Sequence, residues 1–161
     1  MKLWHLLLLA AMPMQAAIGC PIKSNVHPFP ASGPWIDTTE LPAPVVEKVS
    51  VTRGLDGAGS CDRLGLLSIQ LRWPRAKGVD VENVGFEYRV LRGRGPEGML
   101  PDAAVAAPPV SGRRTEHLLT WDDGPQVRGQ PLDLLVEVRA ITRDYRRGPP
   151  AVFVIDEVRS R

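Results

Sequence analysis

Short runs of residues in which apolar and polar side chains alternate constrain the fold of this chain more than any other feature. The clearest run places Leu67, Ile69, Leu71 and Trp73 at every second position, with polar side chains between them. Similar runs cover residues 49–52, 86–90, 118–121, 132–140 and 152–155. A period of two puts alternate side chains on opposite faces of a strand, and no run keeps the helical period of 3.6. The sequence therefore predicts antiparallel sheets with one buried and one exposed face.

These runs all lie within residues 44–159, a length typical of one domain. Open sheets would leave the apolar faces uncovered, so two sheets must pack face to face. Asp122-Asp123-Gly124-Pro125 is a strong turn signal between two of the runs. Residues 93–112 are predicted to be a loop with at most one weak strand. The expected fold class is all-β, an antiparallel β-sandwich of about seven strands.

Residues 1–19 have the features of an export signal. Lys2 supplies a positive start, residues 3–12 form an apolar run, and Ala17 and Gly19 are small residues before a cleavage point. The apolar run is too short to span a bilayer with ease. We therefore expect residues 1–19 to be a signal peptide and the protein to reach a bacterial cell envelope.

Cys20 directly follows this signal, and two chemical states are open to it. Ala17-Ile18-Gly19-Cys20 resembles the lipobox of bacterial lipoproteins, which implies that Cys20 is lipidated and anchors the protein in a membrane facing the periplasm or exterior. Lipidation is our expectation. The alternative is a soluble secreted or periplasmic protein in which Cys20 pairs with Cys61, the only other cysteine. Closing that loop would contribute at most about 4 kcal/mol in the chain-entropy model.

Residues 20–43 are rich in proline and show no persistent apolar period. Prolines recur at 21, 28, 30, 34 and 42. Because proline lacks a backbone donor and favours extended geometry, we expect a proline-rich tether that holds the domain away from its anchor. Phe29 and Trp35 are the exceptions in this stretch, and they either pack back on the domain or touch a membrane or partner.

Five motifs in chain order resemble a fibronectin type III domain. They are Pro42-Ala43-Pro44, Leu71-Arg72-Trp73-Pro74, Gly85-Phe86-Glu87-Tyr88-Arg89-Val90, Val136-Glu137-Val138-Arg139-Ala140 and Gly148-Pro149-Pro150. The resemblance covers residues 42–158 and implies an immunoglobulin-like sandwich. It also implies that Trp73 lies in the core between the sheets, with Tyr88 and Val90 near it. Val136 and Val138 are the core positions expected from the sixth strand.

Two features depart from the family. Leu134 stands where members usually carry a tyrosine early in the sixth strand, so the tyrosine corner is absent. Residues 93–114 form a longer connection than is usual. An immunoglobulin-like relative therefore remains an alternative. The layout of a proline-rich stretch followed by one such domain is similar to that of small bacterial lipoproteins.

The charge and residue inventory favours binding over chemistry. The chain has 20 basic and 18 acidic residues, and a near-neutral sum does not suit a nucleic-acid partner. A nucleophile and base from Cys61 and His117 would need a proximity that the sequence does not indicate. Asp122 and Asp123, with Asp56, Asp62 or Asp102, lack a spaced calcium-loop pattern and are better explained as turn residues. We therefore expect no enzyme, no metal and no cofactor.

The best candidate for partner binding is the loop before the last strand, which carries Arg143, Tyr145, Arg146 and Arg147. Tyrosine and arginine are enriched at binding hot spots, and sandwich domains often bind through end loops. The expected partner is an envelope protein, or an anionic surface, contacted through end loops or an edge strand. A solvated turn is the simpler explanation of the same residues.

A carbohydrate or cell-wall ligand is the alternative binding function. It would need exposed aromatic side chains, and Trp35 and Trp121 are the tryptophans left for it if Trp73 is buried.

Overall fold

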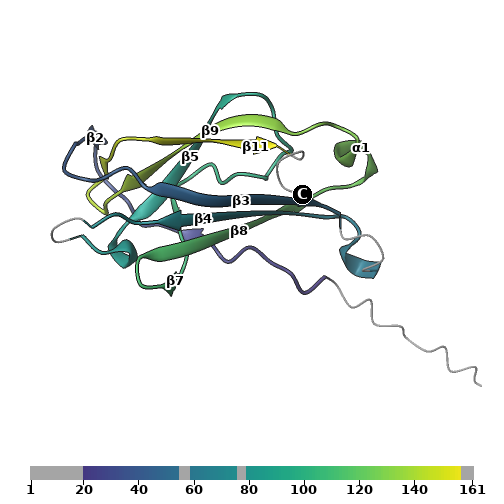
Figure 1. Cartoon of the computed structure of the whole chain (residues 1–161), viewed down its shortest axis with the longest axis horizontal. Coiled ribbons are helices and arrows are strands. Elements are labelled where there is room, and N and C mark those ends of the chain that lie inside the picture. The colour runs from purple at the N-terminus through teal and green to yellow at the C-terminus, as the bar shows by residue number, and fades with distance from the viewer. Residues whose placement is uncertain (1–19, 55–58, 76–78, 157–161) are drawn as a thin grey trace, which may run out of the picture.

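The computed structural model describes residues 20–54, 59–75 and 79–156 (Figure 1). Within them the protein is all-β, with one sheet of seven strands and one of four. The longest described helix, α1 (Pro125–Arg128), has four residues, so none of the described helices has the length needed to cross a membrane. The predicted signal peptide lies outside the described residues.

The four-stranded sheet has the order β3-β4-β8-β7 and is antiparallel throughout. Its strands are β3 (Val45–Arg53), β4 (Leu64–Arg72), β8 (Arg114–Asp122) and the short β7 (Pro109–Ser111). Alternate residues of β4 and β8 are buried, which confirms the predicted period of two.

The seven-stranded sheet is built on β5 (Gly85–Arg92), β9 (Asp133–Ile141) and β11 (Ala151–Asp156). Four two-residue strands extend it: β1 (His27–Pro28), β2 (Ile36–Asp37), β6 (Val105–Ala106) and β10 (Arg146–Arg147). One pair, β2 with β10, is parallel, and the others are antiparallel. Figure 1 shows β9 and β11 stacked over β3, β4 and β8 as two layers.

The core between the layers contains the residues expected there, with one exception. Trp73, Tyr88, Val136 and Val138 are all buried, and Trp73 contacts Phe86 edge to face at a centroid distance of 6.4 Å. Val90 was expected beside Trp73, but 40% of its side chain is exposed. A bulge in the β5–β9 pairing follows it, so this end of β5 leaves the sandwich.

The connection between β5 and β8 is more regular than the sequence indicates. Two short strands, β6 and β7, form there instead of at most one. β6 pairs with β5 in the larger sheet, whereas β7 pairs with β8 in the smaller one. The long connection therefore contributes an edge to both layers.

Residues 20–41, the N-terminal strap, pack on the domain and do not form a free tether. β1 pairs with β6, and β2 pairs with β10. Phe29 is buried against Ala104 and Ile141, and Leu41 joins the main core. The strap runs the length of the sandwich to β2 at the far end (Figure 1). Extended backbone is what edge pairing requires, so the prolines suit this role as well as that of a spacer.

Candidate functional site

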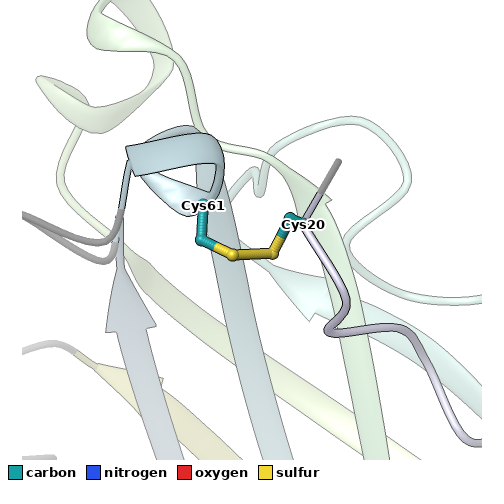
Figure 2. The surroundings of a disulfide bond; sticks show 2 residues. All are labelled: Cys20 and Cys61. Atoms are coloured by element: carbon teal, nitrogen blue, oxygen red, sulfur yellow. A yellow bond between two sulfur atoms is a disulfide. The ribbon is translucent and has the colours of Figure 1, made fainter. Parts of the chain in front are cut away.

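Cys20 is bonded to Cys61 (Figure 2). The S–S distance is 2.05 Å and the two Cα atoms lie 4.9 Å apart. Cys61 is in the short 3₁₀ helix η1 (Gly59–Cys61) that precedes β4. Lipidation would use the sulfur that forms this bond, so the expected lipid anchor on Cys20 is incompatible with this structure. The disulfide alternative is the state observed.

The candidate binding loop is largely covered by the strap. The carbonyl oxygens of Arg143, Tyr145 and Arg147 accept backbone N–H groups of Ser32, Ile36 and Thr38 at 3.0, 3.1 and 2.8 Å. The loop thus serves as the docking edge of the strap. Its backbone is closed to other partners at these positions.

Tyr145 is held in place by backbone geometry and packing. Its φ angle is 60°, and it is the one described non-glycine residue with a positive φ. Its N–H donates to the Thr142 carbonyl at 3.0 Å, and its side chain packs against the small core of Phe29, Ala104 and Ile141. Tyr145 is therefore half-buried and supports the strap.

The arginines of the loop differ in how they are neutralised. Arg146 pairs with Glu40 at 2.8 Å and with Asp144 at 3.0 Å. Arg147 pairs with Glu87 at 2.9 Å. The exposed Arg143 has no ion-pair partner among the described residues. Because acids balance two of the three arginines, the loop lacks the concentrated positive charge that an anionic surface would need.

Trp35 and Ile36 of the strap stand out on this end of the molecule. Their exposed fractions are 59% and 57%, and the Arg147 guanidinium lies 4.9 Å from the centroid of the Trp35 ring. A cation over an aromatic face is attractive and holds the ring in place. We call Trp35, Ile36, Arg146 and Arg147 the Trp35 surface. The only sequence signal for it was that an aromatic residue is unusual in a proline-rich stretch.

A shallow groove adjoins the Trp35 surface along β2. Asp37, Thr38, Glu40, Arg139 and Arg147 contribute polar side chains to it. Arg139 lies 3.8 Å from Asp37 and 3.3 Å from Glu137. The groove is therefore polar, with both signs of charge, and lies open to solvent.

Trp121 belongs to the core and is not exposed. Its side chain is buried, and it lies directly opposite Gly65 on β4. A Cβ atom on Gly65 would overlap the indole ring, so the glycine makes room for it. The carbohydrate hypothesis therefore retains only Trp35. The alternation of Leu119 and Trp121 on one face of β8 was the signal that placed Trp121 inward.

The acidic turn after β8 forms ion pairs. Asp123 is fully buried and pairs with Arg53 at 2.9 Å, while the Trp121 indole N–H donates to it at 3.2 Å. Arg53 also donates to the carbonyls of Val127 and Gln130. Asp122 is exposed, and its hydrogen bond with Arg63 lowers the pKa of its carboxyl. Asp56 lies outside the described residues, and no group of three metal ligands occurs within them.

His117 and Cys61 do not form a catalytic pair. Cys61 is in the disulfide, and His117 is buried in the core with its Nδ1 atom 2.8 Å from the Tyr88 hydroxyl. Burial lowers the pKa of His117 to about 4 and raises that of Tyr88. Nε2 of His117 has no hydrogen-bond partner among the described residues, so a proton there would be costly.

The Trp35 surface is thus the best candidate site that the described residues offer. Comparison with known proteins adds no identity to it, because no protein-family model, no curated protein and no solved structure matches this chain.

Proposed function

We propose that this protein is an exported, non-catalytic binding module that contacts a protein partner through the Trp35 surface. The carrying observation is that Trp35 and Ile36 are adjacent, exposed and yet fixed by the backbone bonds of β2 to the loop before β11. Large apolar side chains that are exposed but rigid lose little entropy on binding, which is why tryptophan dominates interface hot spots.

An apolar protein pocket suits this surface better than an anionic surface. Arg146 and Arg147 are paired with Glu40, Asp144 and Glu87, so the charges largely cancel. Trp35 and Ile36 would then supply the apolar centre of the interface, and the paired charges its polar rim.

The fold proposed for the module is of the fibronectin type III kind, within the immunoglobulin-like class. The order β3-β4-β8 opposite β5-β9-β11 supports this assignment, as does Trp73 in the core. Export through residues 1–19 is also proposed. It is consistent with the Cys20–Cys61 disulfide, because such bonds persist in oxidising compartments.

Site-specific photocrosslinking tests the protein-binding function. A benzoylphenylalanine at position 36 should capture one discrete protein in source cells, and the same probe at Val152, which is also exposed, should not. The captured band should weaken when Trp35→Ala is added. Equal labelling from both positions, or none from position 36, would contradict the proposal. Binding of the wild type to phosphatidylglycerol vesicles, lost in Trp35→Ala, would instead favour an anionic surface.

A carbohydrate ligand is the second candidate, favoured by one observation. The exposed Trp35 ring lies beside the polar groove of Asp37 and Arg139, and an aromatic platform with nearby polar groups suits a sugar. Binding on a glycan array that Trp35→Ala abolishes would support this candidate, and the absence of binding to any glycan would remove it.

A further inference from the structure

The edge of β8 is incompletely covered by its neighbouring strand. β7 pairs with β8 only at Arg114 and Thr115. Peptide groups of Glu116, Leu118 and Thr120 point to the same edge, because alternate residues of a strand direct their polar groups to the same side. Such an edge would be open to another strand if nothing else lay on it.

The strap covers this edge with two side chains and one backbone group. The Asn25 carboxamide donates to the Glu116 carbonyl at 2.8 Å and accepts the Leu118 N–H at 2.8 Å. The Asn25 N–H donates to the Leu118 carbonyl at 3.2 Å. The Ser24 hydroxyl accepts the Thr120 N–H at 3.0 Å. Asn25 therefore stands in for the peptide groups of an added strand.

Little besides the disulfide holds this part of the strap in place. Residues 21–25 are exposed, and the next firm attachments are the β1–β6 pair and Phe29. At the other end Cys20 is bonded to Cys61. Because exposed hydrogen bonds compete with water, the segment needs an attachment at both ends to stay on β8.

The disulfide is open to a reagent from solvent. Cys20 is half-buried and lines a shallow surface groove. The other residues lining that groove include Arg63, Leu64, Thr120, Trp121 and Asp122. A thiolate therefore has access to the Cys20 sulfur, whereas Cys61 is buried.

We propose that residues 116–120 of β8 are a concealed strand-pairing edge, and that the Cys20–Cys61 disulfide is the latch that keeps it covered. When the latch opens, residues 20–25 leave the edge and an extended polypeptide strand pairs with the peptide groups of Glu116, Leu118 and Thr120. This interaction does not depend on the Trp35 surface, which lies at the far end of the strap.

The opening step is reduction by a dithiol. One thiolate of the reductant attacks the Cys20 sulfur, forms a mixed disulfide and releases the Cys61 thiolate, which takes up a proton. The second thiol then displaces Cys20 as a thiol. The protein gains two electrons and two protons, and the reductant becomes its own disulfide.

Amide hydrogen exchange in the full chain tests the latch. After reduction with dithiothreitol, the amides of Leu118 and Thr120 should exchange at least about tenfold faster, because their acceptors on Asn25 and Ser24 are released. The Ile69 amide in the central strand β4 should remain protected, which shows that the fold persists. Unchanged exchange at Leu118 and Thr120 after complete reduction would overturn the proposal.

A peptide tests the pairing edge itself. The probe is a fluorescent peptide of residues 20–29 with serine in place of Cys20. It should bind a full-length variant that combines Cys20→Ser, Cys61→Ser, Ser24→Ala and Asn25→Ala, in which the resident segment has lost its latch and its capping groups. It should not bind the oxidised wild type, and a probe carrying Asn25→Ala should bind neither protein. No binding to the open variant, or equal binding to the oxidised wild type, would refute the edge.

Discussion

The two ends of the sandwich are stabilised in opposite ways. At the end near α1, the buried Asp123–Arg53 pair and the Cys20–Cys61 disulfide join the strap, η1 and the turn after β8. At the other end, the Trp35 surface depends on ion pairs such as Arg146–Glu40, in which the side chains are 38% and 75% exposed. We call these the closed end and the open end.

The difference separates stability from recognition. A buried charge is costly to leave unpaired, so the closed end tolerates little change. Exposed ion pairs contribute little, so residues of the open end are free to serve a partner. Substitutions at the two ends should therefore differ strongly in their effect on unfolding.

The largest effect is expected from Asp123→Ala at the closed end. It leaves the guanidinium of Arg53, 8% exposed, without its carboxylate, which should lower the free energy of unfolding by about 3–5 kcal/mol. Urea denaturation measures the change. Asp122→Ala is the matched control, because Asp122 pairs with Arg63 in solvent and its loss should change stability little. Equal losses for both variants would contradict the contrast.

Acid should weaken the core between the two ends. The pKa of His117 is about 4 in the fold and 6.5 when unfolded, so the unfolded state binds more protons between these values. Stability should be full above pH 6.5, fall as the pH drops towards 4, and lose roughly 3 kcal/mol in all. Denaturant titrations across this range give the curve. A His117→Gln variant should lose the dependence, and a flat wild-type curve would contradict the prediction.

Gly85→Ala should loosen the strap near the open end. A Cβ atom on Gly85 would overlap the Phe29 ring, so the ring must shift. Overpacking of this kind costs about 1–3 kcal/mol. Thermal unfolding measures the loss, and Gly98→Ala, where a Cβ atom meets nothing within 4 Å but φ is 73°, separates backbone strain from crowding. The Phe29 explanation fails if the two variants unfold alike.

Arg146→Ala should have the smallest effect on unfolding. Its partners, Glu40 and Asp144, are largely exposed, so the pairs are screened by water. We expect a change within the error of a urea titration. A marked loss of stability would show that the open end also holds the fold together.

The long strands were predictable because their pattern is local. Leu67, Ile69 and Leu71 announce a buried face without reference to any other part of the chain. Trp73 follows from the same run, and its burial confirms that position in the core. A period of two carries its own evidence within a few residues.

The strap and the buried ion pair were not predictable, because their partners are distant in sequence. Asn25 bonds to residues of β8 more than ninety positions away. Arg53 and Asp123 are separated by 70 positions, and a turn aspartate gives no sign of being buried. Prolines indicate extended backbone equally for a free tether and for an edge strand.

The path of the strap gives the molecule a direction. Cys20 lies at the closed end beside Cys61, and β11 also finishes at that end, so both limits of the described chain emerge there (Figure 1). Trp35 lies at the opposite pole. A support, a neighbouring domain or a label joined at either limit would therefore leave the Trp35 pole pointing outward.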